Sequence, residues 1–190
     1  MNRWDIINKF IQDRNYKSYL EIGVSSGECF RHIKAERKVS VDTNPNTNAT
    51  YNMTSDEYFK AHRTKYDVIF IDGLHTADQA HKDINCAIAH LNPGGIVVVH
   101  DCHPETELMQ QPYTNQHFWT GDVWKAFVVA RKTLPYECYV LDWDFGCGII
   151  DTSRKRTANV DDLPDDICLL CWRDFTEHPE WFDFRREVLS

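Results

Sequence analysis

The sequence contains no apolar run that approaches the roughly 18 residues needed to span a membrane. Its first ten residues include Asp5 and Lys9, which interrupt the apolar stretch that a signal peptide needs. Both absences favour a cytoplasmic protein without a membrane partner. An excess of basic residues is absent as well, because 21 lysines and arginines stand against 29 acids, giving a net charge of −8. Since no basic stripe offsets this acidity, nucleic acid is disfavoured as a partner.

Cysteines are not scarce, but they lack the pattern of a disulfide framework or a zinc site. The chain has seven, an odd number, and most lie within apolar segments. We therefore expect reduced cysteines that act as small buried hydrophobic residues. Cys168 and Cys171 have the spacing of half a zinc site, but no second pair at similar spacing accompanies them. A structural zinc ion is therefore disfavoured there.

Alternating apolar and turn-forming segments predict one α/β domain over residues 1–190, with a core at about 18–150 and an extension at 151–190. Strands are expected at residues 18–22, 38–41, 49–52, 66–71 and 96–99, and then as a terminal antiparallel hairpin at 136–141 and 145–150. Helices are expected at 3–14 within the N-terminal segment 1–16, after Ser26, at 54–63 and 76–91, after Gly121, and at 181–189. Strand–helix alternation favours a Rossmann-like, doubly wound, mostly parallel sheet with helices on both faces.

Acidic residues end four of the predicted strands, and a glycine turn follows the first strand. The acids are Glu21, Asp42, Asp72 and Asp101. Ligands of doubly wound sheets bind across the carboxyl ends of the strands, so these acids are expected to line one site. Gly23 and Gly27 lie four residues apart, a spacing that differs from the Gly-x-Gly-x-x-Gly of dinucleotide folds. The turn alone leaves more than one nucleotide ligand open.

Taken in order, these segments resemble class I S-adenosylmethionine-dependent methyltransferases, in the branch called methyltransferase family 24. The matching segments are residues 21–27 (EIGVSSG), 39–42 (VSVD), 70–75 (FIDGLH), 91–101 (LNPGGIVVVHD) and 121–125 (GDVWK). The resemblance covers about residues 18–150 and implies seven strands, the last antiparallel. It also implies methyl transfer from S-adenosylmethionine to an oxygen atom of a small molecule, such as a sugar or natural-product hydroxyl.

The resemblance further implies where the cofactor binds. The two glycines of the turn would pass under its methionine part, and Glu21 would orient the turn or accept from the cofactor amino group. Asp42 would accept the ribose hydroxyls, and the adenine would lie near Thr54. The expected cofactor-binding residues are Glu21, Gly23, Ser25, Gly27, Asp42, Thr43, Met53, Thr54, Asp72 and Gly73.

His75, His100 and Asp101 are the expected catalytic residues, because a poorly acidic hydroxyl needs a base. Asp72 and Asp101 end neighbouring strands about 5 Å apart and are also the expected ligands of a divalent cation such as Mg²⁺. Metal-dependent relatives place a third acid or amide directly after the second acid, where this sequence has Cys102. A metal ion and a histidine base therefore stay as alternatives.

Residues 102–119 are irregular and are expected to cover the small-molecule acceptor. Tyr113, His117, Phe118 and Trp119 supply aromatic faces on which a ring or sugar could stack. Two other functions stay open: a non-catalytic S-adenosylmethionine-binding scaffold and, less favoured, an NAD(P)-dependent oxidoreductase. Residues 158–166 are acidic and are interpreted as solvated surface, the alternative being part of a homodimer interface.

Overall fold

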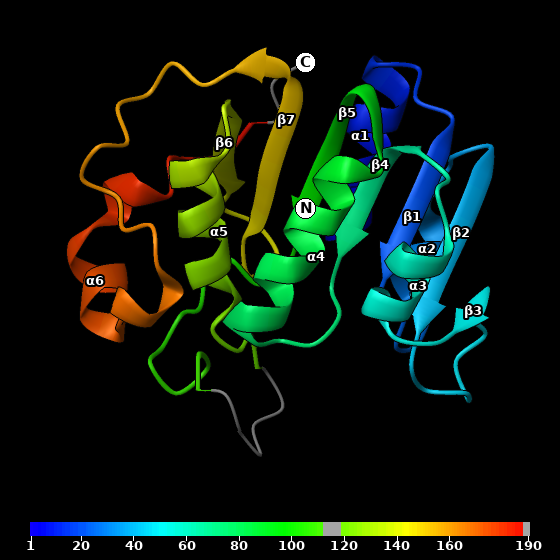
Figure 1. Cartoon of the computed structure of the whole chain (residues 1–190), viewed down its shortest axis with the longest axis horizontal. Coiled ribbons are helices and arrows are strands. Elements are labelled where there is room, and N and C mark those ends of the chain that lie inside the picture. The colour runs from blue at the N-terminus through cyan, green and yellow to red at the C-terminus, as the bar shows by residue number, and fades with distance from the viewer. Residues whose placement is uncertain (112–118, 188–190) are drawn as a thin grey trace.

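A computed structural model describes residues 1–111 and 119–187 and shows one sheet between two layers of helices (Figure 1). The elements are α1 (Arg3–Asp13), β1 (Ser18–Ile22), α2 (Glu28–His32), β2 (Arg37–Asp42), β3 (Tyr51–Asn52), α3 (Ser55–Ala61), β4 (Tyr66–Ile71), α4 (Ala77–Ala89), β5 (Leu91–Val99), α5 (Val123–Thr133), β6 (Tyr136–Leu141), β7 (Cys147–Lys155), α6 (Trp172–Glu177) and β8 (Phe184–Arg185). Short 3-10 helices lie at Ile167–Leu169 and Pro179–Trp181. No helix in these two ranges has the length and apolar composition needed to cross a membrane.

The strand order is β3-β2-β1-β4-β5-β7-β6-β8. Strands β1 to β5 pair in parallel, and β7 lies antiparallel between β5 and β6. This confirms the Rossmann-like sheet and its antiparallel hairpin. The predicted number of seven strands is wrong, because the described part of the chain has eight. The additional strand, β8, pairs in parallel with the outer edge of β6.

The helix predicted at 181–189 is also wrong over its described part, and the same segment supplies β8. Phe182 and Phe184 lie two residues apart, which is the period of a strand and not of a helix. Phe182 is fully buried, and its backbone carbonyl accepts from the amide of Val140 in β6. The segment therefore satisfies an otherwise open sheet edge while burying an aromatic ring.

The predicted boundary between α4 and β5 is also wrong. The predicted helix at 76–91 and strand at 96–99 leave the run 92–95 (NPGG) between them, but α4 ends at Ala89 and this run lies within β5. The pairing of β4 with β5 is irregular between Tyr66 and Val68. Gly95 lies so close to the carbonyl of Asp67 that an added Cβ would be 2.7 Å from that oxygen. The glycine run thus permits a close approach of two strands rather than a helix end.

Both faces of the sheet are buried, as the continuous apolar strands predict. One face carries Tyr19, Val68 and Phe70 and packs against the apolar residues of α1 and α2. The opposite face carries Leu20 and Ile69 and packs against α3, α4 and α5. Figure 1 shows α1 and α2 behind the sheet and α3, α4 and α5 in front of it.

The strand register places the ends of the parallel strands at one level. Ile22 of β1 pairs with Val41 of β2 and with Ile71 of β4, and Ile71 pairs with Val99 of β5. The residues that follow these positions therefore meet along a single carboxyl edge. The site described below lies on that edge.

Candidate active site at the carboxyl edge of the sheet

The turn after β1 needs glycine for reasons within the protein. Gly23 has φ +86°, and an added Cβ would lie 2.0 Å from the backbone oxygen of Asp72. Gly27 has φ +73° and is the N-cap of α2, the place predicted for Ser26. A side chain at Gly23 would push β1 away from the end of β4, so this glycine sets the shape of the edge before any ligand binds.

Asp42 ties the end of β2 to the same turn. Its Oδ2 accepts from the amides of Val24 at 2.8 Å and Ser25 at 3.0 Å. Its Oδ1 accepts from the amide of Asn44 at 2.8 Å. The carboxylate therefore holds two loops together at the carboxyl edge of the sheet.

The larger cavity at this edge has a volume of about 530 Å³. Of the predicted cofactor-binding residues, its lining includes Gly23, Ser25, Asp42, Thr43, Met53, Thr54, Asp72 and Gly73. Glu21 does not line it, and Gly27 lines neither this cavity nor its neighbour. Residues that sequence reasoning did not assign to this site also line it: Asp56, Leu74, Gln79 and Asp83. A capping box begins α3, because Thr54 Oγ1 accepts from the Glu57 amide at 3.2 Å and the Glu57 side chain accepts from the Thr54 amide.

A second cavity of about 330 Å³ lies beside the first, on the α1 side of the edge. Its own lining includes Arg3, Trp4, Glu21, Glu28, His100, Asp101 and Phe145. The two cavities share one wall, formed by Gly23, Ser25, Asp72, His75 and Trp119. Two molecules bound in the two cavities would therefore meet at this wall.

Glu21 is buried at the floor of the second cavity. Its side chain is 1% exposed and accepts a hydrogen bond of 2.5 Å from the hydroxyl of Tyr19. Burial raises the pKa of Glu21 to about 7. It lies within β1, one residue before the strand ends, so it belongs to the strand and not to the turn that follows.

His75 stands at the junction of the two cavities. Its Nδ1 lies 3.1 Å from the carbonyl oxygen of Trp119 and 3.2 Å from Asp101 Oδ2, and its Nε2 lies 3.5 Å from Asp72 Oδ1. The indole of Trp119 stacks on the imidazole at 4.9 Å. Burial opposes the charged imidazolium, but Asp72 and Asp101 prevail and raise the pKa of His75.

Asp72, His75 and Asp101 form a group with metal-ligand spacing, since one ligand atom from each lies within 4.8 Å of the others. Asp101 is a non-glycine residue with φ +61°, in the left-handed region. Such a conformation costs on the order of 1–3 kcal/mol and is often retained where a side chain must be aimed. It brings Asp101 to His75 and also to His100.

His100 lies deeper, with 3% of its surface exposed. Its Nδ1 is 2.9 Å from Asp101 Oδ1 and 3.3 Å from Asp72 Oδ1. Its Nε2 is buried without a hydrogen-bond partner among residues 1–111 and 119–187, and Asp144 Oδ1 is 3.6 Å away. Burial opposes protonation, but Asp101 and Asp72 raise the pKa of His100 well above its ordinary value.

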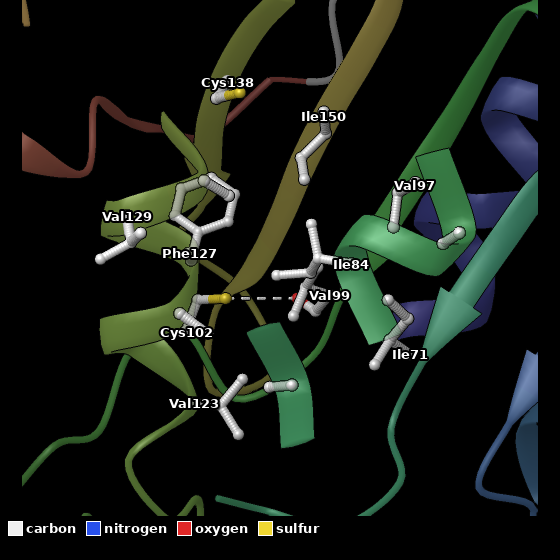
Figure 2. Packing of buried hydrophobic residues seen from close by; sticks show 14 of the residues in the cluster. Ile71, Ile84, Val97, Val99, Cys102, Val123, Phe127, Val129, Cys138 and Ile150 are labelled. Carbon is white, nitrogen blue, oxygen red and sulfur yellow. Dashed lines mark hydrogen bonds between the residues drawn. The ribbon is translucent and has the colours of Figure 1, made fainter. Parts of the chain in front are cut away.

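Cys102 is turned away from this site. Its side chain is fully buried, and its thiol donates to the carbonyl of Val99 at 3.4 Å. Figure 2 shows the sulfur directed toward Val99, among the core residues Val123 and Phe127. Cys102 therefore supplies no third ligand at the carboxyl edge.

Sequence reasoning missed Arg3, whose guanidinium enters the second cavity from α1. Its Nη1 donates to Asp72 Oδ2 at 2.6 Å. Its Nε and Nη2 donate to the two carboxylate oxygens of Asp144, each at 3.0 Å. The helical period of residues 3–14 predicts the helix, but it carries no signal for where the helix starts relative to the sheet.

Other predicted residues lie elsewhere. Tyr113, His117 and Phe118 fall outside the described residues, whereas Trp119 stacks on His75 as noted. Cys168 and Cys171 are exposed and free. Among the residues that the structure describes, no group with metal-ligand spacing includes them.

Comparison with known proteins identifies what the chain is similar to. Residues 20–102 match the model of methyltransferase family 24, described as a methyltransferase domain. No curated protein matches in sequence. An O-methyltransferase from Bacillus cereus in complex with S-adenosylhomocysteine has a TM-score of 0.59 at 12% identity, covering 78% of this chain and 79% of that chain.

Two further solved structures share the fold. A putative caffeoyl-CoA O-methyltransferase from Staphylococcus aureus has a TM-score of 0.60 at 19% identity, with 78% of this chain and 81% of that chain covered. The MycE methyltransferase of the mycinamycin biosynthetic pathway, in complex with Mg, S-adenosylhomocysteine and mycinamycin VI, has a TM-score of 0.50 at 14% identity. There, 81% of this chain and 48% of that chain are covered. Likeness at such identities establishes the fold.

Proposed function

We propose that this chain, which carries a class I methyltransferase domain of family 24, transfers a methyl group from S-adenosylmethionine to a hydroxyl oxygen of a small molecule. The observation that carries the proposal is the pair of cavities with a shared wall. A two-substrate transfer needs two adjoining sites whose reacting groups meet at their boundary.

The larger cavity is assigned to the cofactor. It combines Asp42, a hydrogen-bond acceptor suited to ribose hydroxyls, with Met53 and Thr54 on the side expected for the adenine. Gly23 and Ser25 belong to the wall that this cavity shares with the second one, and Gly73 lines the larger cavity as well. The methionine part and its methyl group would then face the second cavity. S-adenosylmethionine supplies an electrophilic methyl carbon at that boundary.

The second cavity is assigned to the acceptor. Trp4, Trp119 and Phe145 offer aromatic faces, and the acids at its floor accept hydrogen bonds from hydroxyl groups. A sugar or natural-product hydroxyl fits this mixture of aromatic and hydrogen-bonding groups. Holding the hydroxyl in line with the methyl carbon supplies much of the expected rate.

His75 is the base that this geometry favours. The Trp119 carbonyl can only accept, so it assigns the proton of neutral His75 to Nδ1 and leaves the Nε2 lone pair available. The acceptor proton would pass to Nε2 as the oxygen–carbon bond forms and the sulfur–carbon bond of the methyl donor breaks, with S-adenosylhomocysteine as the leaving group. Because Asp72 and Asp101 raise the pKa of His75, its base form should accumulate at higher pH than that of an ordinary histidine, and turnover should rise with pH as it does. Asp101 and His100 would orient His75 and the surrounding charges.

A divalent cation is the second candidate for activating the hydroxyl. The spacing of Asp72, His75 and Asp101 favours it, and MycE was solved with Mg. Asp72 and Asp101 would hold the ion, which when bound would lower the pKa of an acceptor hydroxyl. The donor set fits less well than the spacing suggests, because Asp72 Oδ2 is bound by Arg3 and Cys102 is buried.

The test is transfer of a labelled methyl group from S-adenosylmethionine to a panel of sugars and phenolic or macrocyclic alcohols. We expect His75→Asn to lower kcat by roughly 10²–10⁴-fold. The matched control is His103→Asn, because His103 bonds to Asp142 and lines neither cavity. Equal losses in both variants would contradict the role of His75.

The same assay separates the remaining alternatives. Turnover abolished by a chelator and restored by Mg²⁺ would favour the metal over the histidine base. Binding of S-adenosylhomocysteine without turnover across the panel would favour a non-catalytic scaffold. Binding of NAD or NADP in place of S-adenosylhomocysteine would favour an oxidoreductase.

A further inference from the structure

We propose that Arg3 is the resident cation of the acceptor cavity and that it occupies the place a divalent metal ion would need on Asp72. The inference rests on the proposed function, since it concerns how the same site handles its acidic residues. It makes Arg3 a positioning residue of this methyltransferase and makes the site metal-independent.

The guanidinium of Arg3 is almost fully engaged by carboxylates. It reaches Asp72 Oδ2 at 2.6 Å through Nη1, and it grips both oxygens of Asp144 through Nε and Nη2. The backbone amide of Arg3 also donates to Asp144 Oδ2 at 2.8 Å. Four donors at one end of α1 thus fix this cation, whereas a surface arginine samples many rotamers.

The segment that contains Asp144 has an unusual backbone conformation that favours this contact. Asp144, Phe145 and Gly146 have φ values of +53°, +57° and +82°, so three successive residues are left-handed. Two of them are not glycine, and each such residue costs on the order of 1 kcal/mol or more. The turn between β6 and β7 thereby presents the Asp144 carboxylate to Arg3 and the Phe145 ring to the same cavity.

A metal ion at Asp72 would have to compete with Arg3. A guanidinium is always protonated in a protein and cannot leave its carboxylate by losing charge. Asp72 Oδ1 remains, but it is already shared by His75 at 3.5 Å and His100 at 3.3 Å. A divalent ion next to a fixed positive charge is strongly disfavoured, and Cys102 offers no compensating ligand.

The consequence for the reaction is a fixed orientation of Asp72. With Oδ2 held by Arg3, the carboxylate must direct Oδ1 toward His75. Arg3 therefore acts through Asp72 on the residue that meets the acceptor hydroxyl. A merely structural arginine would anchor α1 without changing what Asp72 can bind.

Arg14 provides the matched control for that distinction. It lies at the other end of α1 and forms a two-point contact with Asp151, at 2.9 Å and 2.6 Å. Asp151 pairs with Ile96 near the start of the apolar part of β5, far along the strand from the carboxyl edge. Arg14→Gln would loosen the same helix without touching either cavity.

The experiment is calorimetric titration of Mn²⁺ into the wild type and five variants: Arg3→Gln, Arg3→Lys, Arg14→Gln, Asp101→Asn and the double variant of Arg3→Gln with Asp101→Asn. Wild type and Arg14→Gln should bind Mn²⁺ only weakly. Removing the charge should tighten binding by at least about tenfold in Arg3→Gln, and the double variant should lose that gain. Arg3→Lys keeps a charge and should stay weak.

Two results would overturn the proposal. One is a wild type that binds Mn²⁺ through Asp101 and with higher affinity than Arg3→Gln does. The other is equal Mn²⁺ affinity in the wild type and Arg3→Gln. If Arg3→Gln does not fold, the Mn²⁺ affinities of the wild type and Asp101→Asn still test the proposal, because tight binding by the wild type that is lost in Asp101→Asn would contradict it. Titration of S-adenosylhomocysteine into each variant runs in parallel. Failure of the folded wild type to bind S-adenosylhomocysteine would reject the proposed function, whereas the comparison of Mn²⁺ affinities tests the role of Arg3.

Discussion

Glu21 should make the stability of this protein fall as pH rises, and Glu21→Gln should remove that dependence. Burial raises the pKa of the folded-state carboxyl from 4.5 to about 7. Between these values the folded state keeps a proton that the unfolded chain has released. The free energy of unfolding contributed by Glu21 is therefore full below about pH 4.5 and declines until the pH passes 7.

The size of the effect follows from that interval. At about 1.4 kcal/mol for each pH unit, the whole decline amounts to about 3 kcal/mol. Glutamine has nearly the same shape and is neutral, and its carbonyl can still accept from the Tyr19 hydroxyl. Glu21→Gln should therefore match the wild type near pH 4.5 and exceed its unfolding free energy by up to about 3 kcal/mol at pH 8.

Urea unfolding followed by tryptophan fluorescence at pH 5 and pH 8 measures this difference. The difference between variant and wild type cancels the other groups that titrate in the same range. Glu105→Gln is the control, because Glu105 is exposed, and its effect should stay within about 0.5 kcal/mol at both pH values. If Glu21→Gln changes the free energy of unfolding by the same amount at pH 5 and pH 8, the reasoning that the buried Glu21 carboxyl ionises between these pH values is refuted.

Two further variants test how the edge is built. Gly23→Ala should unfold more easily by at least about 3 kcal/mol and lose cofactor binding, because its Cβ would meet Asp72 O at 2.0 Å. Gly94→Ala is the control, with φ +79° but no atom nearer than 3.8 Å, so thermal unfolding should show a cost of only about 1 kcal/mol. Asp42→Asn should weaken S-adenosylhomocysteine binding by at least about tenfold, since it removes a charged acceptor. Unchanged affinity would place the ribose elsewhere.

Much of the sheet is predictable because its strands are continuous apolar runs between polar ends. The run 66–71 is buried on both faces and lies where the pattern puts it. The acids at the strand ends can be located from the sequence as well, since each interrupts such a run. Strand register then brings Asp72 and Asp101 together. This proximity follows from the parallel pairing of β4 and β5, and no local sequence pattern indicates it.

The unpredicted parts depend on contacts between segments distant in sequence. Arg3 meets Asp72 and Asp144, which lie 69 and 141 residues away along the chain. Gly23 looks like a ligand-binding glycine, although the backbone of Asp72 is what excludes a side chain there. β8 forms because β6 has an open edge, a condition that the terminal segment alone does not reveal. Sequence patterns thus locate the elements and leave the pairing of their ends to tertiary structure.

The most direct test of the account is calorimetric titration of the wild-type protein with S-adenosylhomocysteine, and separately with NAD. The account predicts binding of one S-adenosylhomocysteine per chain and none of NAD. It also predicts that Asp42→Asn weakens that binding, because this side chain lines the larger cavity. Binding of NAD, or no binding of S-adenosylhomocysteine by a folded wild-type protein, would contradict the assignment of that cavity to the methyl donor.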